Sequence, residues 1–216
     1  MRKKRALVNI VRRGLMLVLS SPSGAGKTTI ARALLQQDSN LRNSVSVTTR
    51  PKRYSEKHGK DYLFVDSKQF VAMRDEEDFL EHVQVFGNYY GTPKEFVFKQ
   101  LEEGFDVIFD IDWQGTQQIA QLARNDLVTV FILPPSMQIL HERLKNRGED
   151  DEVIINERMR NAAAEISHWP EYDYVIVNSD FNDSLAKITT ILEAERLKRT
   201  RQVGLAEFIN QLRQEK

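Results

Sequence analysis

A phosphate-binding loop constrains the fold of this chain more than any other stretch. Residues 21–28 have the sequence SPSGAGKT, directly after the apolar residues 15–19, and a helical pattern of apolar residues follows over 29–37. A glycine-rich turn of this kind directs successive backbone N–H groups and a helix N-terminus toward one point, where they bind phosphate. The stretch therefore predicts a strand, a loop and a helix that together hold a nucleoside triphosphate.

Individual residues of the loop have separate predicted roles. Lys27 would reach the outer phosphates, and the hydroxyl of Thr28 would face Mg²⁺. Loops of this type usually begin with glycine, whereas this chain has Ser21, which fits if the position does not need a positive φ. The predicted nucleotide-binding residues are Ser21, Pro22, Ser23, Gly24, Ala25, Gly26, Lys27, Thr28 and Thr29. An ordinary glycine-rich strand-to-helix turn is the alternative.

Composition limits the partners that this chain would have. The 31 basic and 31 acidic residues balance, so we expect no nucleic-acid partner. Cysteine is absent, which excludes disulfides and thiolate metal sites and fits a cytoplasmic location. The sequence has no apolar run of about 18 residues, so we expect no membrane helix. The four histidines lack the spacing of metal ligands.

The N-terminal residues 1–14 form a basic arm by composition. Six basic residues and no acid occur in residues 1–13, and the apolar piece between them is too short for a signal peptide. We expect a solvated arm ahead of the first strand, with a transit peptide as the alternative.

Apolar runs and helical patterns alternate along the chain. Strands are expected over residues 15–19, 107–111, 128–133 and 174–177, and helices over 29–37, 95–103, 114–124, 136–146 and 183–198. Alternation of this kind predicts an α/β fold with a parallel sheet sandwiched by helices, of the P-loop NTPase type. Ligands of such folds bind at the carboxyl ends of the strands.

Several stretches depart from this alternation. Residues 44–92 are rich in Thr, Tyr, Arg and Gly, with strand-like pieces at 44–48 and 61–65, which predicts a small β-rich insertion. Residues 143–165 are dense in charge, which predicts a mobile helical flap rather than core, within a lid over 136–165. The core would then comprise residues 15–43, 93–135 and 166–198.

The C-terminal tail, residues 199–216, contains apolar residues at helical spacing. Leu205, Phe208, Ile209 and Leu212 follow helical spacing, which predicts an amphipathic helix. We expect this helix to dock on the body of the protein, and self-association is the alternative.

The insertion contains two sets of residues suited to a nucleotide. Arg50 and Arg53 with Tyr62 match phosphate oxygens, although two arginines in a loop are also common at solvated surfaces. Glu81 can accept hydrogen bonds from both N–H donors on the edge of guanine. The hydroxyls of Ser46 and Thr92 can donate to guanine O6. Adenine lacks the 2-amino donor, so it would leave the carboxylate unpaired.

Two further sets of charged residues lie in the predicted core and lid. Asp110 and Asp112 end the strand at 107–111, which places them near the metal and the acceptor, although Asp112 also suits a helix N-cap. Arg143, Arg147, Arg158 and Arg160 offer positive charge to a transferring phosphoryl group. A salt-bridged surface helix is the alternative for these arginines.

The motifs follow one another in an order that resembles the guanylate kinase family. They are S-x-S-G-A-G-K-T, S-V-T-T-R-x-x-R, G-K-D-Y, F-L-E, G-N-Y-Y-G-T, D-I-D-x-Q-G and R-L-x-x-R-G, collinear over about residues 15–198. The resemblance implies a core, a GMP-binding domain at 44–92 and a lid. It also implies transfer of the γ-phosphoryl group of ATP to GMP with Mg²⁺, in a monomer or homo-oligomer.

Residue roles follow from the same resemblance. The GMP phosphate would be held by Arg50, Arg53, Tyr62 and Tyr90. Guanine would be recognised by Ser46, Glu81 and Thr92. Asp110 and Asp112 would lie between the nucleotides, Arg143, Arg147 and Arg158 would close over the phosphates, and Asn178 would contact the adenosine side. The predicted catalytic residues are Lys27, Arg50, Asp112, Arg143, Arg147 and Arg158.

The sequence departs from the family pattern at two places within the matched region, and the basic arm and the tail after about residue 199 extend beyond the usual core. Ser21 replaces the first loop glycine, and Tyr54 and Ser55 stand where a glycine usually precedes Glu56. A non-catalytic module that binds phosphorylated peptides is one alternative, although Lys27 and Thr28 are intact. A kinase for another nucleoside monophosphate is the other.

Overall fold

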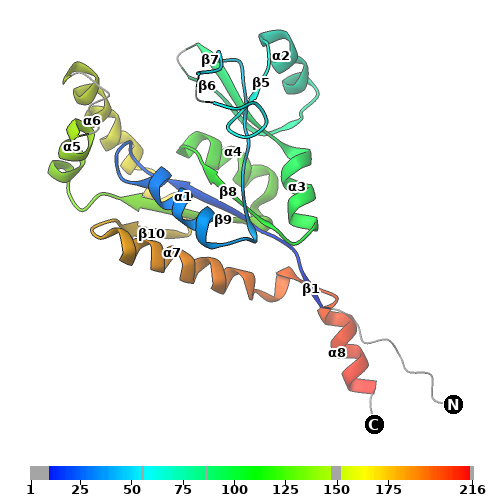
Figure 1. The fold of residues 1–216 in the computed structure, drawn as a ribbon. Helices are drawn as coiled ribbons and strands as arrows, with labels where there is room; N and C mark the ends of the chain where they lie inside the picture. The colour runs from blue at the N-terminus through cyan, green and yellow to red at the C-terminus, as the bar shows by residue number, and fades with distance from the viewer. Residues whose placement is uncertain (1–9, 55, 86, 147–151, 215–216) are drawn as a thin grey trace.

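The computed structural model describes residues 10–54, 56–85, 87–146 and 152–214, and its centre is a five-stranded parallel sheet (Figure 1). In spatial order its strands are β10 (Tyr174–Val177), β9 (Leu127–Leu133), β2 (Met16–Ser20), β8 (Asp106–Asp110) and β3 (Leu41–Asn43). All five residues of β2 are buried, because this strand lies between two neighbours and under helices on both faces.

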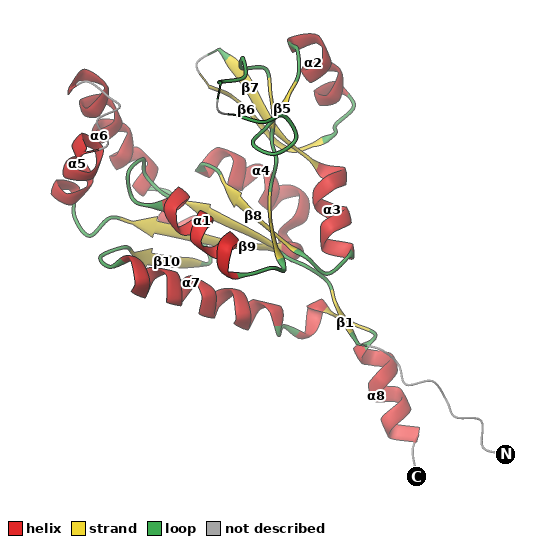
Figure 2. Ribbon diagram, viewed as in Figure 1, coloured by secondary structure: helices red, strands yellow, loops and turns green. Residues whose placement is uncertain are grey.

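Helices cover both faces of this sheet (Figure 2). Leu15, Leu17 and Leu19 pack in one apolar cluster with α1 (Lys27–Gln37) and α7 (Phe181–Arg196). Met16 and Val18 point the other way, to a cluster with α3 (Lys94–Glu102) and α4 (Trp113–Ala123). This alternation of side chains confirms the predicted α/β sandwich.

The β-rich insertion forms a second, four-stranded sheet above the core. Its strands have the order β5 (Leu63–Phe64), β4 (Val47–Thr48), β7 (Asn88–Pro93) and β6 (Phe79–Val85). A helix that the sequence analysis did not predict, α2 (Ser67–Asp75), covers it with Phe70, whose ring stacks 4.7 Å from Phe79 and 5.2 Å from Tyr89. Leu80 on β6 instead joins the core cluster, so β6 connects both units.

Two helices of the lid lie at the carboxyl-terminal edge of the sheet, α5 (Met137–Asn146) and α6 (Glu152–Ile166). Leu144, Ile155 and Ala162 are buried in the main apolar cluster. The expectation of a flap outside the core is therefore wrong for these side chains, because apolar residues are spaced along one face of a highly charged stretch. Arg147 lies outside the described residues.

The two ends of the described chain meet at the opposite edge. β1 (Val11–Arg12) pairs antiparallel with β11 (Gln202–Val203), and α8 (Leu205–Gln214) follows. Short 3₁₀ turns occur at Arg124–Asp126, Trp169–Glu171 and Arg199–Arg201. Helix α8 extends away from the body in Figure 1, and it contains no buried residue, so the docking expectation is wrong in this structure.

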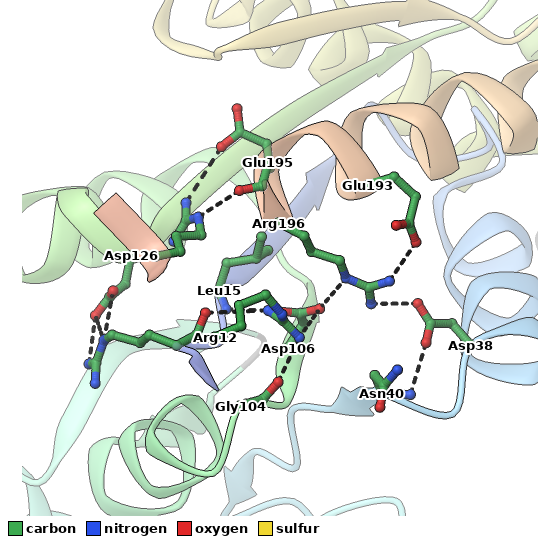
Figure 3. A network of polar contacts seen from close by, with 12 residues as sticks. Arg12, Leu15, Asp38, Asn40, Gly104, Asp106, Asp126, Glu193, Glu195 and Arg196 are labelled. Carbon is green, nitrogen blue, oxygen red and sulfur yellow. Dashed lines mark hydrogen bonds and ion pairs between the residues drawn. The ribbon is translucent and has the colours of Figure 1, made fainter. Parts of the chain in front are cut away.

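Ion pairs hold Arg12 and Arg13 to the core (Figure 3). Arg12 and Arg196 both contact the fully buried carboxylate of Asp106, which also accepts from the backbone N–H of Leu15 at 2.9 Å. Arg13 pairs with Asp126 at 2.8 Å. Residues 12 and 13 therefore do not belong to a solvated arm, because acidic partners distant in sequence face them.

Candidate active site

The phosphate loop begins where β2 ends and leads into α1. Gly26 precedes the helix with φ +104°, and a Cβ there would lie 2.5 Å from Nδ2 of Asn178. Only glycine therefore fits this position. Among the described residues other than glycine, Glu77 alone has a positive φ, so Ser21 meets the condition under which serine replaces the first glycine.

Asp110 at the end of β8 faces the two polar residues that open α1. Lys27 Nζ lies 3.0 Å from Oδ1 of Asp110 and donates to the carbonyl of Ile111 at 3.1 Å. The hydroxyl of Thr28 donates to Oδ2 of Asp110 at 2.6 Å. Pairing of Leu19 with Asp110 in adjacent strands produces this proximity, as the strand-end argument predicts.

A cleft of about 520 Å³ opens over this loop. Its walls comprise Ser21, Pro22, Ser23, Gly24, Gly26, Lys27, Thr28, Thr29, Asp110, Asp112, Arg143, Glu165, Asn178 and Phe181. Of the predicted nucleotide-binding residues only Ala25 is absent from this lining, because its side chain is buried beneath the loop. The structure thus brings the predicted donor-nucleotide residues to one cavity.

Side chains from β10 and the lid surround the loop. Nδ2 of Asn178 donates to the carbonyl of Ala25 at 2.7 Å, and Arg143 donates to the backbone carbonyl of Asn178 at 3.0 Å. Arg158 Nη1 donates to Oγ of Ser23 at 3.1 Å. Arg143 therefore lines the cleft, and Arg158 contacts Ser23, which lines it.

Two residues of the cleft were not predicted from the sequence. Glu165, near the end of α6, lines the cleft, and burial raises its pKa although the charge of Lys27 opposes this rise. Phe181 begins α7 and is partly exposed to the cleft. Neither residue belongs to a spaced motif. Only Phe181 could have been suspected from the sequence, because it follows shortly after Asn178.

A buried carboxylate lies at the other end of the site, in the insertion. Glu81 on β6 is 4% exposed, and its Oε1 accepts from the hydroxyl of Thr92 at 2.6 Å. Oγ of Ser46 lies 3.4 Å from the same Thr92 hydroxyl. Burial raises the pKa of Glu81 to about 7, and the charge of Asp112 adds to the rise, while the Thr92 hydrogen bond lowers it.

Arg50 and two tyrosines form a group suited to an anion. Arg50 lies 5.5 Å from the ring centre of Tyr62, and the rings of Tyr62 and Tyr90 are 6.0 Å apart. The hydrogen bond from Arg50 to Glu56 is the main cause of the raised pKa of the guanidinium. Burial raises the pKa of the Tyr62 hydroxyl, so Tyr62 stays a neutral donor at pH 7.

Glu56, for which no role was predicted from the sequence, contacts this group through Arg50. Its carboxylate contacts Arg50 at 2.6 Å and accepts from the backbone N–H of Arg53 at 2.8 Å. The Arg50 hydrogen bond is the main cause of the lowered pKa of Glu56. Arg53 itself is exposed, so the structure places it beside the cluster rather than in it.

Asp112 lies between these two regions. It caps α4 by accepting from the backbone N–H of Gly115 at 3.0 Å, so the N-cap alternative is confirmed. Its charge also raises the pKa of both Glu81 and Glu165, which belong to the two opposite sides. The cap fixes a carboxylate at the junction of the insertion and the cleft.

The described ranges bear on metal binding and on membrane insertion. These ranges contain no group of three or more His, Asp or Glu side chains that would hold a metal by themselves. Thr28 and Asp110 offer oxygen atoms, which fit an Mg²⁺ ion held mainly by substrate phosphates. None of the helices described combines the length and apolar character needed to cross a bilayer.

Comparison with known proteins gives concordant matches over most of the chain. The profile of the guanylate kinase family matches residues 13–195. A guanylate kinase of Paramagnetospirillum magneticum is 57% identical, covering 96% of this chain and 97% of the relative. One of Rhodospirillum rubrum is 56% identical, covering 94% of both. The crystal structure of guanylate kinase from Anaplasma phagocytophilum superposes with a TM-score of 0.75 at 42% identity, covering 93% of this chain and 96% of that chain.

Proposed function

The chain belongs to the guanylate kinase family, and we propose that its cleft and its insertion hold the two nucleotides of the family reaction. This protein transfers the γ-phosphoryl group of ATP to GMP, giving ADP and GDP. The roles of individual residues in this reaction are the substance of the proposal.

ATP would occupy the cleft over the phosphate loop. Backbone N–H groups of residues 21–29 would bind its phosphates, and Lys27 would contact the outer ones. Asn178 and Arg143 lie at the same wall and would face the adenosine side and the phosphates. Arg158, and Arg147 outside the described residues, would complete the positive charge above them.

GMP would occupy the insertion. The guanidinium of Arg50 and the hydroxyls of Tyr62 and Tyr90 would bind its phosphate, with Arg53 approaching from the exposed side. Glu81 would accept hydrogen bonds from the two guanine N–H donors, and the hydroxyls of Ser46 and Thr92 would donate to guanine O6. The single observation that supports this assignment most is the buried Glu81 carboxylate with hydroxyl groups at its side.

Phosphoryl transfer between the two nucleotides would depend on their positioning more than on proton transfer. The acceptor is a phosphate oxygen that is already anionic, so no strong general base is required. Lys27 and the lid arginines would stabilise the charge that spreads over the equatorial oxygens, and Asp110 and Asp112 would orient the acceptor. Thr28 and Asp110 would hold Mg²⁺, which neutralises phosphate charge when bound.

We assign the core to residues 15–43, 93–135 and 166–198, the GMP-binding domain to 44–92 and the lid to 136–165. ATP and GMP would be the partners, without nucleic acid or membrane, in a monomer or homo-oligomer. A cytoplasmic location is supported by the absence of cysteine.

Paired variants test the division into two nucleotide sites. Glu81→Gln places an amide donor against guanine donors, so we expect a loss on the order of 2–4 kcal/mol in kcat/KM for GMP with unchanged ATP binding. Lys27→Ala should abolish turnover while GMP binding persists. Calorimetric titration of each nucleotide into each variant checks both, and equal effects on ATP and GMP would refute the division.

A further inference from the structure

Strand β6, which carries Glu81, is an edge strand of the sheet in the insertion. Its neighbour β7 pairs with one side of it, where His82 lies opposite Gly91. No described strand lies along the other side, so the backbone N–H and C=O groups there need partners from elsewhere in the molecule. Whatever pairs with this edge therefore helps to determine where Glu81 lies.

Gln118 on α4 pairs with this edge through both polar atoms of its amide group. Its Oε1 accepts from the backbone N–H of His82 at 3.0 Å, and its Nε2 donates to the backbone carbonyl of the same residue at 3.0 Å. The side-chain amide thus takes the place that a peptide group of a further strand would occupy. Two hydrogen bonds between the same two residues fix the orientation of the strand as well as its distance from the helix.

Helix α4 also contacts the residues that precede His82. Leu80 is buried in one apolar cluster with Ile119, the residue next to Gln118. Gly115, one turn earlier on the helix, lies so close to Glu81 that a Cβ there would be 3.2 Å from its Oε2. The carboxylate of Glu81 is therefore held between an apolar contact and a pair of hydrogen bonds that both come from the same helix.

We propose that Gln118 is a positioning residue that determines selectivity for guanine, because it holds the β6 backbone, and with it the Glu81 carboxylate, against α4. This inference rests on the proposed assignment of guanine to Glu81. A carboxylate that meets two N–H donors at once has to be aligned with the edge of the base, and hydrogen bonds weaken steeply when they are misaligned. A strand free to shift at His82 would lose this alignment first.

Comparison of GMP with IMP tests the proposal, since the base of IMP is guanine without the 2-amino group. Gln118→Met keeps the length of the side chain and removes both amide atoms. We expect the ratio of kcat/KM for GMP to that for IMP to fall about tenfold, through a higher KM for GMP, with the KM for ATP unchanged. Gln118→Glu should lower the ratio similarly, because it sets a carboxylate oxygen against the carbonyl of His82.

Hydrogen exchange at the backbone N–H of His82 measures the pairing itself and needs no nucleotide. We expect exchange about tenfold faster in Gln118→Met than in the unmodified protein. The matched control is Gln121→Met, an exposed glutamine three residues later on the same helix, which should alter neither the exchange nor the ratio. A merely structural role of Gln118 would lower the melting temperature and reduce kcat/KM for GMP and IMP in parallel.

Three results would overturn the proposal. They are unchanged exchange at His82 in Gln118→Met, faster exchange with an unchanged ratio, or an equal fall of the ratio in Gln121→Met. Calorimetric titration of GMP and IMP into the same variants repeats the comparison without turnover. If GMP binds to the unmodified protein but is not phosphorylated, the proposed function fails, while the exchange and the binding ratio still decide the role of Gln118.

Discussion

At the scale of single residues, Glu81 combines a functional role with a cost to stability. Its carboxylate is almost fully buried, and its pKa rises to about 7 from an ordinary value of 4.5. The ionised form that would bind guanine is therefore the form that the folded protein tolerates least. Functional sites often retain such groups at the expense of stability.

Substitution of Glu81 by glutamine should stabilise the nucleotide-free protein above pH 7. A raised pKa in the folded state means that the folded protein binds the proton more tightly, so this contribution is complete below about pH 4.5 and is lost as pH rises through about 7. Glutamine does not ionise, so Glu81→Gln avoids this loss of stability. We expect its free energy of unfolding to exceed that of the unmodified protein by about 1–3 kcal/mol at pH 8 and by little at pH 4.5. Urea unfolding at both pH values measures it, and a gain independent of pH would contradict this account.

Gly115 on α4 limits the space beside Glu81. A Cβ at this position would lie 3.2 Å from Oε2 of Glu81 and 3.2 Å from Cδ1 of Ile111. Gly115→Ala should push the carboxylate away from guanine and lower kcat/KM for GMP about tenfold or more, with the KM for ATP unchanged. Gln121→Ala, on the exposed face of the same helix, is the control; equal kinetics in both variants would show that Glu81 adjusts freely.

Residues that belong to spaced motifs were predictable from the sequence, and isolated ones were not. Lys27, Thr28 and Asp110 follow from a strand, a loop and a neighbouring strand end, and the structure brings all three together. Glu56 contacts Arg50, and Glu165 reaches the cleft, only because of tertiary folding. No pattern in the surrounding sequence distinguishes them from surface carboxylates.

At the scale of elements, strongly apolar strands were predicted best. The run at 15–19 became β2, shifted by one residue, because a continuous apolar stretch suits only a strand buried on both faces. Helix α2 was missed because its single buried residue, Phe70, leaves almost no periodic signal. Helix α8 has a clear amphipathic pattern, but such a pattern does not say which surface the helix meets.

Strand β8 has separate polar roles at its two ends. Asp110 at the last position faces the phosphate loop, whereas Asp106 at the first position holds Arg12 and Arg196 (Figure 3). The second arrangement lies at the opposite edge of the sheet from the cleft. Stability and catalysis can therefore be separated by mutation within one strand.

Removal of the buried Asp106 carboxylate should destabilise the fold without impairing the site. Asp106→Ala leaves two guanidinium groups and one backbone N–H without their acceptor, so we expect a loss of about 3–5 kcal/mol in the free energy of unfolding. The urea midpoint measures this, while kcat at low temperature should hardly change. Glu103→Ala, an exposed carboxylate nearby, serves as control, and a loss below about 1 kcal/mol would contradict the assigned role.

At the scale of the whole molecule, the two nucleotide sites lie on units that connect to the core differently. The insertion contributes its own small core around Phe70 and shares β6 with the main one. The lid helices pack on the main cluster through Leu144 and Ile155 and reach the loop through Arg158. Reaction between nucleotides held on separate units requires these units to approach and exclude water.

Binding of both nucleotides should therefore close the molecule. We expect residues 44–92 and 143–165 to move toward the core when GMP and a non-hydrolysable ATP analogue bind together. Small-angle scattering should report a smaller radius of gyration with both ligands than with neither. Identical scattering curves, or crystal structures of the two states that superpose throughout, would contradict closure.

The proposed function depends on guanine recognition by Glu81 beside a working phosphate loop. The most direct test is ADP release in a coupled assay with GMP, AMP, CMP and UMP, run on the unmodified protein and on Glu81→Gln. We predict that GMP is phosphorylated far faster than the others and that the substitution removes most of this preference. Faster turnover of another monophosphate, or an unchanged preference for GMP in Glu81→Gln, would contradict it.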